Sequence, residues 1–153
     1  GLCWQGKKSS QSYPGRSFSL EDMKPLAKIK GAVFVSLQAQ YGSSQLDLCS
    51  FRDRFIGFQD KIELMKDFVN TASIMKQCDL IVSCDTGIAH LSCALGIPTL
   101  VVTKEVPSPY WGNNEVNSIL YKDCHISRKR LGESWEECFD RTVGVLISSG
   151  QLA

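Results

Sequence analysis

Residues 79–99 read DLIVSCDTGIAHLSCALGIPT, and the fold is decided by this stretch. It opens with an apolar run at residues 80–82, which is typical of a strand buried on both faces of a parallel sheet. The triplet Asp-Thr-Gly at residues 85–87 breaks the run. Apolar residues then return at helical spacing, and a helix stop signal follows: Ile88, Leu91, Leu95, then Gly96 and Pro98. The stretch therefore predicts a buried strand, a polar turn and a helix.

The turn at Asp85, Thr86 and Gly87 is the candidate binding site. Ligands of open parallel sheets bind at the carboxyl ends of the strands, and helix N-termini attract phosphates. Gly87 lets a ligand approach the backbone, either Asp85 or Thr86 can cap the helix, and His90 lies one turn beyond Thr86 on the same face. This pattern predicts a pyrophosphate site. Because a carboxylate repels a diphosphate, Asp85 is expected to cap the helix or to bind sugar hydroxyls.

The turn has two other interpretations. Asp-Thr-Gly is also the active-site triplet of aspartic proteases, which share one proton between two such carboxylates. Those enzymes resemble all-β barrels with Ser, Thr or Ala after the Gly, whereas Ile88 and a helix follow here, so the context argues against a protease. A turn that binds nothing, with His90 packed in the core, stays open.

The rest of the chain alternates strand and helix patterns. Strands are expected at residues 1–4, 32–37, 54–58, 99–103 and 119–126, and helices are expected to begin near residues 19–22, 67–70 and 134. The helix after residue 67 is expected to carry Phe68, Ala72 and Met75 on one apolar face, and Ser134 begins a capping box. This alternation predicts an α/β fold, a Rossmann-like three-layer domain with a mostly parallel sheet that spans residues 1–153.

Bulk properties exclude several classes of protein. The net charge of +1, from 17 basic and 16 acidic residues, lacks the strong positive charge that is typical of nucleic-acid-binding proteins. No apolar run approaches the length of a membrane span. The 7 cysteines form no Cys-x-x-Cys pair, so reduced thiols in a cytoplasmic protein are favoured over disulfides or a zinc site. The basic run at residues 127–130 is interpreted as a solvated turn.

The residues 85–91, DTGIAHL, followed by ALGIPT at residues 94–99, resemble the donor-site motif of glycosyltransferases of the GT-B fold. The similarity is greatest to the heptosyltransferase-like family and to the glycosyltransferase domains that follow tetratricopeptide (TPR) repeats. Further segments resemble the C-terminal domain of that family in the same order along the chain: residues 1–6, 16–17, 34–38 and 67–72. The resemblance implies that this chain is the C-terminal, donor-binding half of such an enzyme.

The family's properties imply roles for particular residues. A nucleotide-diphosphate sugar would be the donor, bound without a metal or other cofactor, and an N-terminal domain outside this chain would bind the acceptor and carry the catalytic residue. No catalytic residue is therefore assigned here, and this half is not expected to catalyse sugar transfer on its own. The implied contacts are Asp85, Thr86, Gly87 and His90 with the diphosphate and sugar, Lys7, Lys8 or Arg16 with the leaving diphosphate, and Gln38 with the base or ribose.

Two departures from the family keep alternatives open. Residues 9–14, SSQSYP, lack the charge that is usual in the family's first loop, and the region 40–54 is short. The weak charge favours the alternative of a non-catalytic nucleotide-binding or scaffold module of the same fold. An epimerase of this fold that acts on nucleotide sugars is a third candidate.

Overall fold

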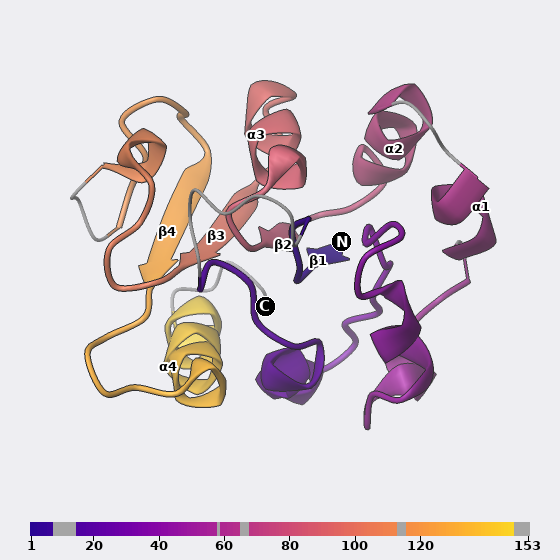
Figure 1. The fold of residues 1–153 in the computed structure, drawn as a ribbon, viewed down its shortest axis with the longest axis horizontal. Helices are drawn as coiled ribbons and strands as arrows, with labels where there is room; N and C mark the ends of the chain where they lie inside the picture. Colours follow the sequence, from indigo (N-terminus) through magenta and orange to yellow (C-terminus); the bar gives the residue numbers. More distant parts are fainter. Residues whose placement is uncertain (8–14, 58, 65–67, 113–115, 149–153) are drawn as a thin grey trace.

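A parallel sheet forms the middle layer of the molecule (Figure 1). The computed structural model describes residues 1–7, 15–57, 59–64, 68–112 and 116–148. The strands lie in the order β1 (Leu2–Cys3), β2 (Ile81–Ser83), β3 (Thr99–Thr103) and β4 (Cys124–Arg128), and each neighbouring pair is parallel. The expected α/β, Rossmann-like fold is therefore confirmed. The strand expected at residues 99–103 matches β3, whose residues are all buried.

Two further extended segments continue the sheet beyond β1. Leu2 forms a parallel bridge with Ser36, because its N–H donates to the carbonyl of Val35 at 2.9 Å and its carbonyl accepts from the N–H of Leu37 at 2.9 Å. Phe34 in turn forms a parallel bridge with Phe55. The expected strands at residues 32–37 and 54–58 are thus present as short bridged segments. The spatial order is therefore residue 55, residues 34–36, β1, β2, β3 and β4.

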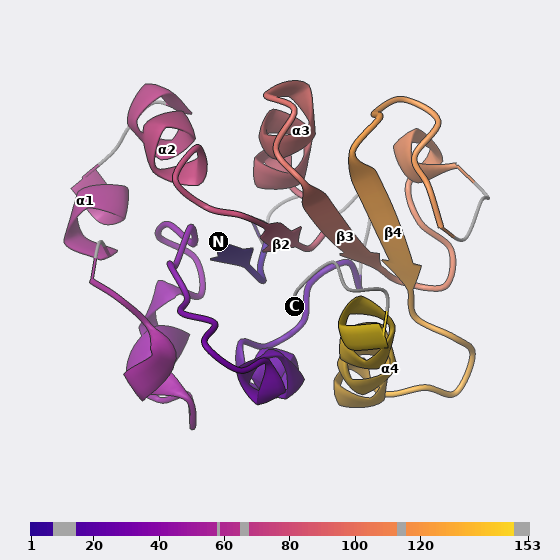
Figure 2. The same ribbon diagram turned by 180° about the vertical axis from the view of Figure 1, so that it is seen from behind.

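The order of the strands reverses between β1 and β2. The chain leaves β1 toward residues 34–36 on one side and returns to β2 on the other, so the connections diverge between these two strands (Figure 2). In open α/β sheets, a ligand binds at this switch point, outside the carboxyl ends of the strands. The segments that follow β1 and β2 are Trp4–Lys7 and Cys84–Gly87.

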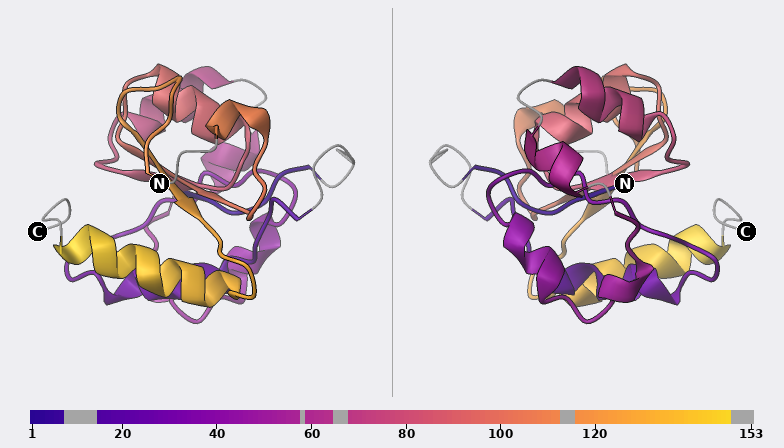
Figure 3. Two further views of the ribbon diagram at one scale, coloured as in Figure 1. Left: turned by 90° about the vertical axis from the view of Figure 1, so that its left-hand side faces the viewer. Right: turned by 90° about the vertical axis from the view of Figure 1, so that its right-hand side faces the viewer.

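Helices cover both faces of the sheet, which gives three layers (Figure 3). One face carries α1 (Gln59–Leu64), α2 (Phe68–Met75) and α3 (Gly87–Ala94), and the other carries the 3₁₀ helix η1 (Glu21–Lys28) and α4 (Trp135–Ser148). The remaining short 3₁₀ helices are η2 (Ser43–Asp47), η3 (Arg52–Arg54) and η4 (Pro109–Trp111). Within the described ranges, none of the helices has the length and apolar character needed to cross a bilayer.

Alternating side chains of the central strands pack into two hydrophobic cores, one on each face of the sheet. Leu100 and Val102 of β3 belong to the cluster under η1 and α4, in which Phe18 meets Phe139 edge to face at 5.0 Å. Val101 points to the opposite face and packs with Trp111 beneath α3. Because both faces of β3 are buried, the strand reads as a continuous apolar run.

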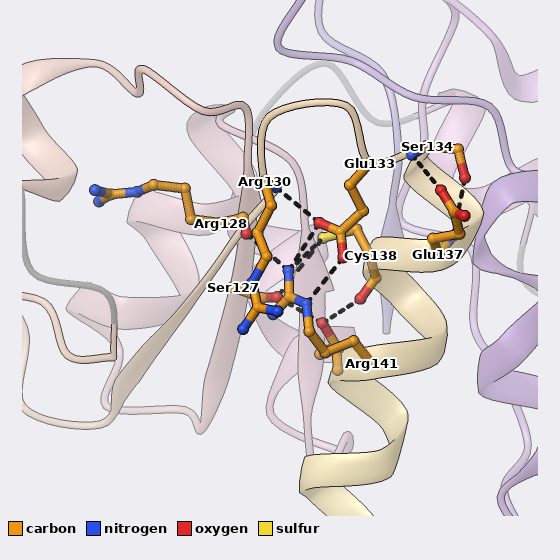
Figure 4. Close-up of polar contacts among 9 residues, drawn as sticks. Ser127, Arg128, Arg130, Glu133, Ser134, Glu137, Cys138 and Arg141 are labelled. Atoms are coloured by element: carbon orange, nitrogen blue, oxygen red, sulfur yellow. Dashed lines mark hydrogen bonds and ion pairs between the residues drawn. The ribbon is translucent and has the colours of Figure 1, made fainter.

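The turn between β4 and α4 is fixed by charged side chains (Figure 4). Ser134 and Glu137 form the predicted capping box: the Ser134 N–H donates to the Glu137 carboxylate at 2.7 Å, and the Glu137 N–H donates to the Ser134 hydroxyl at 3.2 Å. The Arg141 guanidinium, one turn further on, donates to both carboxylate oxygens of Glu133. This network fixes the start of α4 on the sheet.

Two expectations about the elements were wrong. The last strand begins at Cys124 rather than at Ile119, whose side chain is exposed. The buried residues of α2 are Thr71 and Met75, whereas Phe68 lies 58% exposed at its first turn. In both places apolar residues lie on the surface, and an apolar pattern alone cannot separate them from core positions.

Candidate functional site

A pocket of about 330 Å³ lies at the switch point, where the segments after β1, β2 and β3 converge. Its lining consists of Gly6, Lys7, Arg16, Asp85, Thr86, Gly87, His90, Ser108 and Tyr110. Most of the residues proposed from the sequence are therefore brought to one place, although they come from two distant parts of the chain. Lys8 lies outside the described residues.

Hydrogen bonds close the base of the loop that follows β1. The N–H of Gly6 donates to the hydroxyl of Ser17 at 3.1 Å, and the N–H of Phe18 donates to the carbonyl of Trp4 at 3.2 Å. These bonds hold the two ends of the loop together. As a result, the cationic side chains of Lys7 and Arg16 line the same pocket, although the loop separates them in sequence.

Gln38 does not line the pocket, and its buried side chain binds the loop instead. Its Oε1 accepts from the N–H groups of Trp4 at 3.0 Å and Gln5 at 2.9 Å. Its Nε2 donates to the carbonyls of Gln5 at 2.7 Å and Tyr41 at 2.6 Å. The amide therefore fixes the backbone that precedes Lys7, and a contact of Gln38 with a base or ribose stays a prediction.

The turn after β2 leaves the N-terminus of α3 open. Thr86 is the N-cap residue, yet no side chain caps the helix. Its hydroxyl lies 3.1 Å from the Ser83 hydroxyl, so it faces the strand ends. Asp85 as a residue is 8% exposed, and its carboxylate makes no hydrogen bond or ion pair within the described ranges. The expectation that Asp85 or Thr86 caps α3 was therefore wrong, and the first-turn N–H groups keep their capacity to bind an anion.

Two buried thiols lie beneath the turn. The Cys3 Sγ is 3.7 Å from the Thr86 hydroxyl oxygen. Hydrogen bonding from the Cys84 thiol lowers the pKa of Cys3, and burial raises the pKa of Cys84 well above its ordinary value. Both residues are buried, and all seven cysteines are free thiols. Across the described part of the chain, no group of three or more His, Cys, Asp or Glu side chains could hold a metal ion.

Aromatic side chains from the β3–β4 connection surround His90. The imidazole stacks on Trp111 with ring centroids 4.6 Å apart and an interplanar angle of 19°, and it meets Tyr110 edge to face at 5.6 Å. The Tyr121 hydroxyl lies 3.1 Å from His90 Nδ1. None of these aromatic residues was proposed from the sequence. A signal was available, because they lie in the connection that follows β3, a strand parallel to the one before Asp85.

The pocket thus combines two kinds of chemistry. Lys7 and Arg16 supply positive charge on the side of β1, and the open helix N-terminus adds the partial positive charge of its N–H groups. Asp85 and His90 supply groups that pair with hydroxyls or with hydrogen-bond acceptors. This arrangement suits a ligand that carries both an anionic and a hydroxyl-rich part.

A larger hollow of about 600 Å³ lies between β4 and α4. None of the residues proposed from the sequence lines it. Two of its cations are already paired, Lys129 with Glu105 and Arg141 with Glu133. The switch-point pocket is therefore the better candidate site.

A comparison with known families matches the middle of the chain. Residues 66–133 match the family model described as glycosyltransferase family 9 (heptosyltransferase). This segment, slightly less than half of the chain, includes the turn at residues 85–87 and His90 but not Lys7 or Arg16. No curated protein and no solved structure matches the chain. The match supports a glycosyltransferase family 9-like domain.

Proposed function

We propose that the chain is the donor-binding half of a GT-B glycosyltransferase, and that the switch-point pocket binds a nucleotide-diphosphate sugar. The observation that carries this proposal is the convergence of Lys7, Arg16 and the uncapped N-terminus of α3 around one pocket. The match of residues 66–133 to a glycosyltransferase family supports it independently.

The electrostatics of the pocket suit the departure of a nucleotide diphosphate. When the glycosidic bond of the donor breaks, negative charge grows on the diphosphate, and fixed cations and helix N–H groups stabilise that charge without a metal. Lys7 and Arg16 are the side chains proposed for this role. Asp85 would repel a phosphate, so its carboxylate is placed against the hydroxyls of the sugar.

A second domain outside this chain is part of the proposal. It would bind the acceptor and supply the catalytic base, as the GT-B resemblance implies, so this half alone binds the donor and does not transfer the sugar. An association with TPR repeats belongs to the same proposal. We also propose a reducing, cytoplasmic location, since all seven cysteines are free thiols.

Calorimetric titration with nucleotides tests the donor site. The folded 153-residue chain is titrated with UDP, ADP and GDP, and with inorganic phosphate for comparison. At least one nucleotide is expected to bind, and Lys7→Ala or Arg16→Ala should each weaken its binding by about tenfold, since a hydrogen bond to a charged group contributes about 1.5–3 kcal/mol. No binding of any nucleotide at millimolar concentration would overturn the proposal.

A matched control separates the local effect from a change in overall charge. Lys24 lies on η1, where its ammonium group is 3.8 Å from the Glu21 carboxylate, and it does not line the pocket. Lys24→Ala removes the same charge and should leave nucleotide affinity unchanged. If all three variants bind equally well, the loop after β1 does not serve a diphosphate.

A further inference from the structure

The ring of His90 is held on several sides by the connection between β3 and β4. Trp111, which is fully buried, stacks against one face of the imidazole, and Tyr110 meets it edge to face. The Tyr121 hydroxyl approaches Nδ1 to 3.1 Å. Since α3 fixes the backbone of His90, these contacts restrict the orientation of the imidazole. Nδ1 is occupied, so Nε2 is the nitrogen that remains for the pocket that His90 lines.

The contact between Tyr121 and His90 can form in two ways. A neutral imidazole has one N–H donor and one nitrogen acceptor, and a phenol can donate or accept. If Nδ1 carried the proton and donated to Tyr121, Nε2 would present a lone pair to a pocket that already contains the Asp85 carboxylate. If Tyr121 donates to Nδ1, the Nε2–H group faces the pocket instead.

The second arrangement is favoured on chemical grounds. A phenol is a stronger acid than a neutral imidazole, and an imidazole nitrogen is a stronger base than a phenol oxygen, so the proton belongs between them as O–H···N. The Tyr121 hydroxyl has no other hydrogen bond to a described residue. Its proton is therefore available for Nδ1.

We infer that Tyr121 is a positioning residue that holds His90 in the Nε2–H tautomer, so that the imidazole presents a hydrogen-bond donor to the ligand. This inference rests on the proposed function for the identity of the ligand, because a phosphate oxygen is an acceptor only and needs such a donor. The tautomer itself is a property of the free protein and can be measured without any ligand.

Long-range ¹H–¹⁵N NMR spectra test the tautomer directly. The chain has 2 histidines, so two imidazole spin systems are expected, and His125→Gln assigns them. In alkaline solution, where imidazoles are neutral, His90 should show a protonated Nε2 and an unprotonated Nδ1. Tyr121→Phe should move the Nδ1 shift of His90 toward the tautomer mixture of an unrestrained imidazole and leave His125 unchanged.

Control variants keep the test specific. Tyr110→Phe removes a hydroxyl that makes no hydrogen bond to His90 in the described part of the chain and keeps the edge-to-face ring, so it should leave the tautomer unchanged. A His90 that carries its proton mainly on Nδ1 overturns the inference. So does a Tyr121→Phe protein with native amide shifts and an unaltered imidazole. If Tyr121→Phe does not fold, the spectrum of the unmodified chain still decides between the tautomers.

A double-mutant cycle connects the tautomer with binding. With the nucleotide that binds best among UDP, ADP and GDP, Tyr121→Phe should weaken binding severalfold. In the His90→Ala background, the same change should have no effect, because Tyr121 acts through His90. An equal loss in both backgrounds contradicts the positioning role. Absence of nucleotide binding contradicts the proposed function but leaves the tautomer measurement valid.

Discussion

The guanidinium of Arg16 lies so close to Gly6 that a Cβ atom at residue 6 would be 3.0 Å from Nη2 of Arg16. A methyl group at this position would therefore push the guanidinium away by a few tenths of an ångström. Because Arg16 is proposed to bind the diphosphate, Gly6→Ala should weaken nucleotide binding by roughly two- to fivefold, less than the roughly tenfold loss expected of Arg16→Ala. Calorimetric titration measures the effect.

The Arg16→Ala background provides the control for this prediction. Once the guanidinium is absent, Gly6→Ala has nothing to displace and should cost no further affinity. The melting temperature of each variant shows whether the fold is retained. A loss of affinity in Gly6→Ala that persists in the Arg16→Ala background would mean that residue 6 itself contacts the ligand.

Gly87 offers the opposite case, because the free protein has room for a side chain there. A Cβ atom at this position would meet only the Phe68 ring, with Cζ at 3.7 Å, which is ordinary van der Waals contact. Gly87→Ala should therefore fold with unchanged or slightly higher stability, since Ala is the better helix former. If a diphosphate contacts the first turn of α3, the added methyl should reduce nucleotide affinity by about tenfold or more. Wild-type affinity in calorimetry would place the ligand away from Gly87.

Gln38 shows how a residue outside the pocket supports it. Gln38→Met keeps the volume but removes the acceptor for the N–H groups of Trp4 and Gln5. Because leaving a buried donor unsatisfied costs about 1–3 kcal/mol, the free energy of unfolding should fall by roughly 2–4 kcal/mol. Urea unfolding measures this loss. Gln77→Met, at an exposed position on the opposite end of the sheet, is the control and should change stability by less than about 0.5 kcal/mol.

The sequence was most informative where local chemistry and burial agree. Residues 99–103 are apolar or small and β-branched and lie in the middle of the sheet, so the predicted strand coincides with β3. The Ser134 capping box uses only side chains within one turn, and it formed as expected. The turn at residues 85–87 was located correctly, although the role of Thr86 as a cap was not.

The remaining features depend on contacts between distant parts of the chain. β4 ends in Ser127 and Arg128, which are polar, and pairing with β3 decides its bounds. The hydroxyl of Ser127 lies beside that of Thr142, a contact that no local pattern predicts. The aromatic residues around His90 belong to an irregular segment, and the parallel arrangement of β2 and β3 brings them to His90.

The ion pair between Glu133 and Arg141 predicts a pH dependence of stability. The Arg141 guanidinium donates to both oxygens of the carboxylate, at 2.9 and 3.0 Å (Figure 4). These bonds lower the pKa of Glu133 from 4.5 to about 2. A lowered pKa means that the ionised carboxylate stabilises the folded state above pH 4.5, and that this contribution is lost as the pH falls toward 2. At pH 7, Glu133→Gln should lower the free energy of unfolding by about 1.5–3 kcal/mol.

The pH series separates the ion pair from a general effect of charge at the start of α4. The difference in stability between the unmodified chain and Glu133→Gln should shrink between pH 4.5 and pH 2, because in that interval the carboxylate of the unfolded chain binds a proton more readily than the folded one. Glu136→Gln removes an exposed carboxylate from the same turn and should have a small effect at every pH. Urea unfolding at several pH values measures both variants. A Glu133→Gln difference that stays constant down to pH 2 would contradict a stabilising pair, because a carboxylate with a lowered pKa in the folded state must lose most of its contribution in this interval.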